Sequence, residues 1–500
     1  MTATQHFDVL IVGAGISGVG SAYHLTQQTP DLTFAVLENQ ASFGGTWLTH
    51  KYPGIRSDSD LYTFGYRFKP WVGTPIATGA EIRKYMGEVI DDNDLARHIR
   101  YSRQVEGARW SSDENLWTLE VTNKATGESE RYTGAFLWMC QGYYGHAKGY
   151  TPEWDGMADF KGQIVHPQTW PESLDYKGKR VVVIGSGATA ATLIPSIADD
   201  VAHVTMLQRS PTYMVPGRNV DDMANQLREL EIPEEWIHEI VRRQRLKMGQ
   251  MFTSMALAYP DAAKQQLLAG VSEFIGEELT AKHFTPSYKP WRQRIAFVPD
   301  GDLFKAIKAG KAEVVTDEIE RFTETGILLK SGQTLEADIV ITATGFNLSV
   351  LGDIPFDVDG KPVDWADTVT YRGMMFTGVP NMGWVFGYFR ASWTLRVDIM
   401  ADFVCRLLKH MKATGARKVT VEAPADMPRD AWIDPDNFNP NYLMRSIHLM
   451  PRRGNVPEWQ HTQDYWLEKD ALPAIDLEGP EFHYAGKTAV AKKAALEPAE

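Results

Sequence analysis

Two glycine-rich turns, each placed between an apolar run and a helix-forming run, are the segments of this sequence best suited to hold a nucleotide. Residues 7–12 (FDVLIV) lead into Gly13, Gly15 and Gly18 with the spacing GxGxxG. Such a turn lets backbone N–H groups approach a pyrophosphate at the N-terminus of the following helix. Glu38 ends the next apolar run, twenty residues after Gly18, where a carboxylate can accept hydrogen bonds from ribose hydroxyls. This pattern predicts a dinucleotide-binding site.

The same pattern returns in the middle of the chain. Residues 180–184 (RVVVI) lead into a second turn formed by Gly185, Gly187, Ala188, Thr189 and Ala190. The next apolar run ends at Arg209, which is followed by Ser210 and stands where the first copy has Glu38. A guanidinium pairs with a ribose 2′-phosphate, which a carboxylate would repel. We therefore expect NADPH here; the alternative is that Arg209 is an ordinary solvated residue.

Two dinucleotide sites in one chain indicate electron transfer between two dinucleotides, and we expect FAD at the first and NADPH at the second. The chain has 500 residues, which suffices for two or three domains. Its two cysteines, Cys140 and Cys405, are far apart and form no CxxC motif, so dithiol redox chemistry has no candidate residues. No close group of His, Cys and carboxylate residues has metal-ligand spacing, and no metal is expected.

The charge balance and the length of the apolar runs argue against nucleic-acid binding and against a transmembrane helix. The chain carries 51 Lys and Arg against 64 Asp and Glu, a net charge of -13 that disfavours binding to nucleic acid. No apolar run approaches the roughly 18 residues that a transmembrane helix needs, and the first residues do not resemble a secretory signal. A small-molecule substrate and a cytoplasmic location are the expectations.

Two segments after the first nucleotide pattern are candidates for contact with a flat ligand. Residues 43–47 (FGGTW) contain a glycine pair that lets the backbone come close to a ligand, which makes Gly45, Thr46 and Trp47 candidate cofactor contacts. Residues 52–58 (YPGIRSD) continue this region. An ordinary Pro-Gly turn with exposed charges fits that second segment equally well.

Residues 160–171 (FKGQIVHPQTWP) lie between the two nucleotide patterns. They resemble the fingerprint of the type I Baeyer–Villiger monooxygenases, FxGxxxHxxxW followed by Pro or Asp. The matching residues are Phe160, Gly162, His166, Trp170 and Pro171. Related N- and S-oxygenating flavin monooxygenases carry Tyr or Phe in place of the tryptophan. For His166 a hydrogen-bonded structural role that couples the domains is favoured over a role as a proton carrier.

The resemblance extends over most of the chain and implies an active-site pair. The segment 289–304 resembles the stretch that supplies the family's active-site arginine, which is Arg294 by position, with Arg292 as the alternative. Asp58 corresponds to the carboxylate that supports this arginine. Thr344 and Gly345 belong to the family's ATG motif, where the chain returns to the flavin domain.

One departure from the family pattern points to a subgroup. Many members have Asp after the ATG motif, whereas this chain has Asn347. Together with the segment CQGYYGH at 140–146, this resembles the subgroup of the mycobacterial ethionamide-activating monooxygenase.

The predicted fold class is α/β, with two Rossmann-like dinucleotide-binding domains, the NADPH domain being inserted in the FAD domain and carrying a helical insertion. The expected bounds are 1–148 and 352–500 for the FAD domain, 149–216 and 292–351 for the NADPH domain, and 217–291 for the insertion. Met248, Met251 and Met255 have helical spacing in that insertion and are expected to fill a core; the alternative is that they line a substrate entrance. About ten C-terminal residues are expected to be disordered.

The resemblance implies an NADPH- and O2-dependent flavoprotein. It would convert ketones to esters or lactones through a C4a-peroxyflavin, and would oxidise sulfides as well. Arg294 would stabilise the anionic peroxide and the adduct, since a guanidinium keeps its charge. The alternatives are an N- or S-oxygenase without this activity and an NADPH-dependent flavin reductase.

Overall fold

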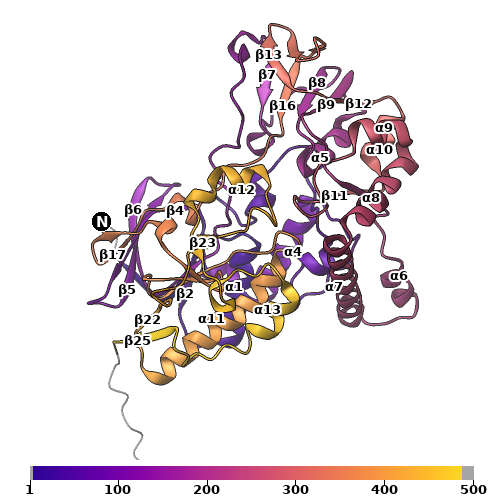
Figure 1. Ribbon diagram of the computed structural model, residues 1–500. Helices are drawn as coiled ribbons and strands as arrows, with labels where there is room; N and C mark the ends of the chain where they lie inside the picture. The colour runs from indigo at the N-terminus through magenta and orange to yellow at the C-terminus, as the bar shows by residue number, and fades with distance from the viewer. Residues whose placement is uncertain (1–3, 487–500) are drawn as a thin grey trace, which may run out of the picture.

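The computed structural model describes residues 4–486 and contains two sheets with a parallel core (Figure 1). The larger sheet has the order β18-β17-β4-β5-β6-β1-β2-β3, and β21 pairs with the end of β6. Its strands are β1 (Gln5–Val12), β2 (Phe34–Leu37), β3 (Ile99–Arg100), β4 (Arg103–Ser111), β5 (Leu116–Asn123), β6 (Glu128–Met139), β17 (Phe356–Val358), β18 (Lys361–Pro362) and β21 (Met382–Trp384). The last four residues of β1 and all of β2 are buried, as expected for parallel strands covered on both faces.

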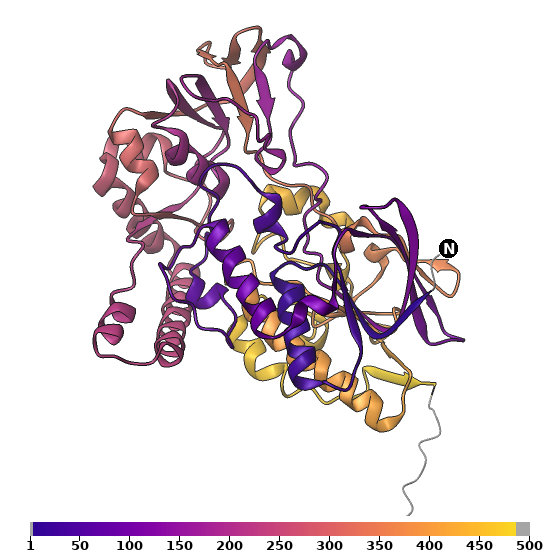
Figure 2. The same ribbon diagram turned by 180° about the vertical axis from the view of Figure 1, so that it is seen from behind.

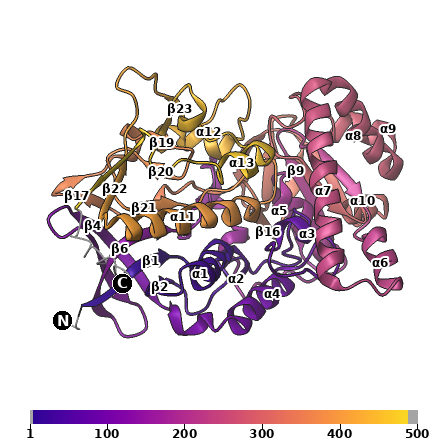
Figure 3. The same cartoon turned by 90° about the horizontal axis from the view of Figure 1, so that it is seen from below.

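Helices cover the larger sheet. The main ones are α1 (Ile16–Gln28), α4 (Gly79–Asp92) and α11 (Thr394–Thr414), with the short helices α2 (Thr46–Thr49), α3 (Leu61–Phe64), α12 (Asn441–Ser446) and α13 (Tyr465–Ala471) nearby. Helices α1 and α11 lie side by side although they come from opposite ends of the chain (Figure 3). A Cβ at Gly20 would lie 2.8 Å from the ring of Tyr66 and 3.2 Å from Val397, so the small residues of α1 allow this close packing.

The smaller sheet is entirely parallel, in the order β12-β9-β8-β16-β7. Its strands are β7 (Gln163–Val165), β8 (Arg180–Ile184), β9 (His203–Gln208), β12 (Ala312–Thr316) and β16 (Ile339–Thr342). An antiparallel sheet of β13 (Ile319–Thr323), β14 (Gly326–Leu329) and β15 (Thr334–Glu336) adjoins it, and α5 (Ala188–Ile197) and α10 (Asp302–Lys308) pack nearby. The predicted α/β class with two Rossmann-like units is confirmed, while the exact domain bounds stay predictions.

Four helices lie on the side of the molecule away from the N-terminus (Figure 2). They are α6 (Asp222–Glu229), α7 (Glu234–Ala258), α8 (Pro260–Ile275) and α9 (Glu277–His283). The side chains of Met248 and Met251 are 56% and 61% exposed. The expectation of core filling was therefore wrong for Met248 and Met251, whereas Met255 is half-buried. Helical spacing shows which residues share a face but not which face is covered.

Helix α7 is attached to the larger-sheet part of the molecule through α3. The Arg242 guanidinium donates hydrogen bonds to the carbonyls of Tyr62, Thr63 and Gly65, at the end of α3, over 2.9 to 3.2 Å. These carbonyls have no partner within so short a helix, so a buried cation satisfies them.

The remaining strands form small two-stranded pairs outside the two main sheets. They are β10 (Met214–Gly217) with β11 (Ala296–Pro299), β19 (Thr370–Tyr371) with β20 (Met375–Phe376), β22 (Lys418–Val421) with β25 (Phe482–Ala485), and β23 (Asp430–Ala431) with β24 (Arg452–Arg453). Within residues 4–486, no helix has both the length and the apolar character required to cross a membrane. The C-terminal segment for which disorder was expected lies outside the described residues.

Candidate active site

A guanidinium and a carboxylate from distant segments of the chain meet at the candidate site. Arg294 Nη2 donates to Asp58 Oδ1 at 2.8 Å, and Arg294 Nε lies 2.7 Å from Asp58 Oδ2. Nη2 also donates to Ser59 Oγ at 3.1 Å, and Nη1 donates to the Phe389 carbonyl at 3.3 Å. The second N–H of Nη1 has no partner among residues 4–486. The Arg294 side chain as a whole is 41% exposed, so a bound molecule can reach it.

The surroundings keep this guanidinium charged. Burial acts to lower the pKa of Arg294, but the attraction of Asp58 and of neighbouring phenol groups outweighs it and raises the pKa above its usual value. Arginine does not lose its proton in proteins in any case. The paired carboxylate also offsets the cost of placing a cation among protein groups.

Arg292 occupies a different environment. Its backbone N–H donates to the Lys289 carbonyl at 3.1 Å, and its own carbonyl accepts the N–H of Asn439 at 2.9 Å. No contact with Asp58 joins it among the described residues. Of the two arginines left open by the sequence, the structure brings only Arg294 to the carboxylate.

The loop that carries Asp58 is held against the smaller-sheet part of the molecule. Arg56 forms a two-pronged ion pair with Asp302 at the start of α10, with N···O distances of 2.5 and 3.2 Å. Gly54 has φ +75°, and a Cβ there would lie 1.8 Å from Ser196 Oγ on α5. Segment 52–58 is therefore not a turn with exposed charges: it joins the two sheets at the level of Asp58.

The first glycine-rich turn contains glycines required for different reasons. Gly13 has φ +101°, and a Cβ on it would lie 2.8 Å from the Cys140 carbonyl oxygen, whereas a Cβ on Gly18 would lie 1.8 Å from the Gly13 oxygen. Gly15 has φ -73°, and a Cβ there would meet nothing nearer than Gly45 Cα at 3.5 Å. Neither backbone conformation nor packing requires glycine at that position. The space suits a ligand that approaches the backbone.

Glu38 is buried at the end of β2. Its Oε2 accepts the Ala14 N–H at 2.6 Å and its Oε1 accepts the Gln40 N–H at 2.8 Å, so the carboxylate is fixed beside the turn. Burial raises the pKa of Glu38, and these hydrogen bonds oppose the rise. Close by, Thr46 begins α2 and Trp47 packs edge-on against an aromatic ring of α3 at 5.8 Å.

The second turn repeats this arrangement. Gly185 has φ +129°, and a Cβ there would lie 2.3 Å from the Ala343 carbonyl oxygen. Gly187 has φ -79°, and a Cβ there would have no atom within 4 Å. Ala188 begins α5, and the hydroxyl of Thr189 interacts with the buried Tyr52. As at Gly15, the glycine at 187 leaves room that the protein itself does not fill.

Arg209 and Ser210 follow β9 at the rim of this turn. Both are exposed, and the Ser210 carbonyl accepts a hydrogen bond from Ser186 Oγ at 3.1 Å. Arg209 is near enough to Glu318 to lower the pKa of that carboxyl, after the larger effect of Lys330. The guanidinium is thus exposed beside the second glycine-rich turn.

The five fingerprint residues take up structural positions. Phe160 is buried beneath the antiparallel sheet β13-β15, and a Cβ on Gly162 would lie 2.3 Å from the Asp338 carbonyl oxygen. Trp170 is partly buried with Tyr176 edge-on to it at 6.1 Å, and Pro171 is exposed.

His166 joins the two segments that connect the sheets. Its Nε2–H donates to the Gly345 carbonyl at 3.0 Å, and its Nδ1 accepts the Gln168 N–H at 3.1 Å. These partners require the neutral ring with its proton on Nε2, and burial lowers the pKa of His166 further. Thr344 fixes the same place, because its Oγ1–H donates to the Tyr150 carbonyl at 2.6 Å.

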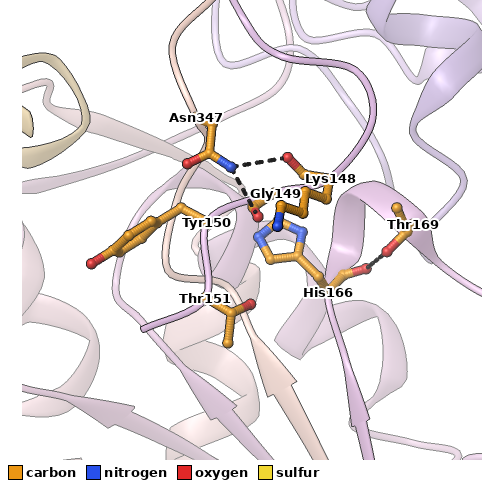
Figure 4. A pocket seen from close by; sticks show the side chains of 7 residues that line it. All are labelled: Lys148, Gly149, Tyr150, Thr151, His166, Thr169 and Asn347. Atoms are coloured by element: carbon orange, nitrogen blue, oxygen red, sulfur yellow. Dashed lines mark hydrogen bonds between the residues drawn. The ribbon is translucent and has the colours of Figure 1, made fainter. Parts of the chain in front are cut away.

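A pocket of about 290 Å³ opens at this junction (Figure 4). Asn347 Nδ2 donates to the carbonyls of Lys148 and Gly149, each at 3.2 Å. An ionised Asp, which many family members have here, could not donate these bonds. The pocket is lined by Lys148, Gly149, Tyr150, Thr151, His166, Thr169 and Asn347.

Three tyrosines near Arg294 were missed as site residues by the sequence reasoning. They are Tyr143, Tyr144 and Tyr442. The first two belong to the CQGYYGH segment, which was noted only as a sign of the subgroup. Nothing in the sequence around Tyr442 marks it, because it reaches the site through the folding of the C-terminal region.

Comparison with known proteins agrees with this arrangement. A model of the NAD(P)-binding Rossmann-like domain matches residues 11–71, and a model named flavin-binding monooxygenase-like matches residues 76–229. Among solved structures, oxidised steroid monooxygenase bound to NADP has a TM-score of 0.76 at 22% identity, covering 96% of this chain and 99% of that one. The open structure of cyclohexanone monooxygenase has a TM-score of 0.75 at 21% identity, covering 96% and 100%.

Sequence relatives are nearer. The FAD-containing monooxygenase EthA of Mycolicibacterium smegmatis is 45% identical over 484 residues, covering 96% of this chain and 97% of that protein. The probable FAD-binding monooxygenase AlmA of an Acinetobacter species is 43% identical over 98% of this chain and 99% of that protein. The resemblance expected from the fingerprint and the CQGYYGH segment is confirmed. With such identity over nearly its whole length, the chain belongs to the family of FAD-containing monooxygenases.

Proposed function

We propose that this chain is an NADPH-dependent Baeyer–Villiger monooxygenase that converts ketones to esters or lactones with O2 and also oxidises sulfides. The observation that carries the proposal is the Arg294–Asp58 pair, in which a permanently charged guanidinium is held on one side and open on the other. Catalysis of nucleophilic attack on a carbonyl needs such a fixed positive group where negative charge develops.

The two glycine-rich turns fit the two nucleotides. Gly15 leaves open space beside the buried Glu38 carboxylate, which suits the pyrophosphate and ribose of FAD. Gly187 leaves open space with Arg209 exposed at the rim, which suits NADPH. When bound, FAD supplies the oxygen chemistry and NADPH supplies the reducing equivalents.

The residues of this chain orient the substrate and stabilise charge. The free N–H of Arg294 Nη1 is available to the carbonyl oxygen of a ketone. Asp58 holds the guanidinium through two contacts, so its orientation does not have to be established during the reaction. His166, with both ring nitrogens occupied, contributes a connection between the sheets.

A product analysis tests the proposal. The purified, FAD-loaded chain is supplied with NADPH and O2 and with a panel of linear aliphatic ketones, aryl ketones and sulfides. We expect esters or lactones from ketones and sulfoxides from sulfides, with one NADPH consumed for each product. Sulfoxides without any ester would identify an S-oxygenase instead. NADPH consumption that yields hydrogen peroxide alone would identify a reductase.

A further inference from the structure

A cluster of three phenols lies beside the Arg294–Asp58 pair. Tyr143 and Tyr144 follow β6, and Tyr442 is on α12; we call these three residues the phenol cluster. The hydroxyl oxygens of Tyr143 and Tyr144 are 2.6 Å apart. The ring of Tyr442 lies 6.4 Å from the first ring and 6.0 Å from the second. All three side chains interact electrostatically with Arg294.

The rings of the phenol cluster are fixed by packing, and each residue keeps part of its surface accessible. Tyr143 stacks on Trp393, with ring centres 5.3 Å apart and planes 9° from parallel. The Trp393 indole in turn donates to Ser17 Oγ at 2.8 Å, in the first turn of α1 beside the first nucleotide turn. Tyr144 packs on Phe346 at 4.5 Å. Ring contacts therefore link Ser17, beside the first nucleotide turn, to Tyr143, which interacts electrostatically with Arg294.

The hydroxyls of the phenol cluster are neutral hydrogen-bond donors. Burial raises the pKa of each phenol well above its usual value, so no phenolate forms near neutral pH. The pair of Tyr143 and Tyr144 has two O–H protons, and the bond between them uses one. Tyr442 is hydrogen-bonded to both of these phenols, so the three hydroxyls are partners of one another. Because hydroxyl protons rotate, a bound carbonyl oxygen can replace one of these acceptors and receive the hydrogen bond. Tyr144 interacts electrostatically with Asp58 as well as with Arg294, so it lies near both members of the pair.

We propose that the phenol cluster donates a hydrogen bond to the carbonyl oxygen of the substrate, so that a phenol and the Arg294 guanidinium share the negative charge that develops there. This inference rests on the proposed function and adds a second donor to it. Two donors aimed at one oxygen are the usual arrangement for stabilising such an anion. No bond is broken in this step: the phenol keeps its proton and donates only a hydrogen bond.

Phenylalanine substitutions test the proposal because they preserve the ring and remove only the hydroxyl. Tyr143→Phe, Tyr144→Phe and Tyr442→Phe, together with the double variant Tyr143→Phe/Tyr144→Phe, are compared in the FAD-loaded full chain. For each one, kcat/KM is measured with acetophenone and with methyl phenyl sulfide. The matched control is Tyr484→Phe, whose hydroxyl donates to the Leu477 carbonyl in the C-terminal region.

The ratio of the two activities is the decisive result. A sulfide has no carbonyl oxygen on which charge could develop, so it does not need the donor. We expect kcat/KM for acetophenone to fall about 100-fold in Tyr144→Phe, and kcat/KM for the sulfide to change by less than about threefold. Binding of acetophenone to the oxidised protein with NADP+, measured calorimetrically without turnover, is expected to weaken about three- to tenfold. The control is expected to behave like the unaltered chain.

Two outcomes overturn the proposal. Either all four variants keep the ketone-to-sulfide ratio and the acetophenone affinity of the unaltered chain, or ketone and sulfide oxidation fall by the same factor, as a merely structural role would produce. An unaltered chain that oxidises methyl phenyl sulfide but no ketone would instead contradict the proposed function, so the two failures are distinguishable.

Discussion

The Asp58 carboxylate contacts the Arg294 guanidinium through both of its oxygens, although 236 residues separate the two in the sequence. One residue comes from the loop after the first nucleotide turn and the other from the segment that leads into β11. The contact fixes the direction of the guanidinium and leaves one of its N–H groups free.

Removing this guanidinium is expected to impair ketone oxidation much more than sulfide oxidation. In Arg294→Ala, kcat/KM for ketones falls about 1000-fold because a charged donor to the developing anion is lost, whereas sulfide oxidation falls less than about tenfold. For Arg294→Lys, kcat/KM for ketones is expected to lie between the values of the unaltered chain and of Arg294→Ala, since an ammonium keeps the charge without the planar fork. Product formation from acetophenone and from methyl phenyl sulfide is the measurement.

Arg292→Ala is the control for the Arg294 variants, because Arg292 shares the segment but has no contact with Asp58 among the described residues. It is expected to retain ester formation. Full ketone oxidation in Arg294→Ala, or its loss in Arg292→Ala alone, would contradict the assignment of the free N–H to the substrate.

Substitution of Gly187 by alanine is expected to weaken NADPH binding without changing the stability of the fold. Since a Cβ at this position meets no protein atom within 4 Å and φ is -79°, Gly187→Ala is expected to change the unfolding free energy by less than about 0.5 kcal/mol. The added methyl group occupies the space assigned to the pyrophosphate of NADPH. We expect KM for NADPH to rise at least about tenfold, equivalent to ~1.4 kcal/mol, while the FAD content is unchanged.

A matched substitution completes the Gly187 experiment. Gly249, on α7, likewise has no atom within 4 Å of its added Cβ. Gly249→Ala is expected to leave KM for NADPH unaltered. Chemical denaturation and steady-state kinetics measure both proteins, and an unchanged KM in Gly187→Ala would argue against a nucleotide at this turn.

Arg209 is expected to distinguish NADPH from NADH. Loss of a charge-assisted contact to the 2′-phosphate in Arg209→Ala should raise KM for NADPH about 10- to 100-fold and leave KM for NADH nearly unchanged. Arg218→Ala removes another exposed arginine, one paired with Asp222 at 2.8 Å, and serves as the control. Equal losses for both nucleotides would mean that Arg209 does not contact the phosphate.

His238 predicts a pH dependence of stability. Its Nδ1 accepts the Trp71 N–H at 3.1 Å, and burial, followed by repulsion from Arg242, lowers its pKa to about 4. The unfolded chain binds this proton near pH 6.5, so the stabilising contribution is complete above pH 6.5 and is lost as the pH falls toward 4. The unfolding free energy is expected to drop by up to about 3 kcal/mol through this group.

The variant His238→Gln retains a side-chain acceptor for Trp71 without titrating. Its unfolding free energy, measured by denaturant titration at several pH values, is expected to fall less steeply between pH 6.5 and 4. An identical slope in both proteins would assign the pH dependence to other groups.

Local patterns could be predicted from the sequence because they depend on neighbouring residues. The turns at Gly13 and Gly185 are visible in the chain, as both need left-handed backbone between an apolar strand and a helix. The Arg294–Asp58 contact was implied only by the family resemblance. Spacing along the chain does not predict a contact between residues 236 positions apart.

The remaining features depend on how distant segments pack. Tyr442 lies about 300 residues from Tyr143 and Tyr144 in the sequence, and no sequence periodicity predicts that these residues are neighbours. The exposure of Met248 and Met251 also depends on which face of α7 the rest of the molecule covers. The face that carries Arg242 packs against α3, and the two methionines are exposed. Such contacts become visible only in three dimensions.

Asp58 and Arg294 come from two different parts of the chain, so their contact depends on the correct packing of these parts. Each nucleotide turn is complete within its own sheet, but Asp58 meets Arg294 only when the loop 52–58 has docked against α5 and α10. A molecule docked imperfectly would still hold both nucleotides and consume reductant, and it would release that reducing power as hydrogen peroxide. If the proposed function holds, the yield of ester per NADPH therefore measures how completely the loop 52–58 is docked.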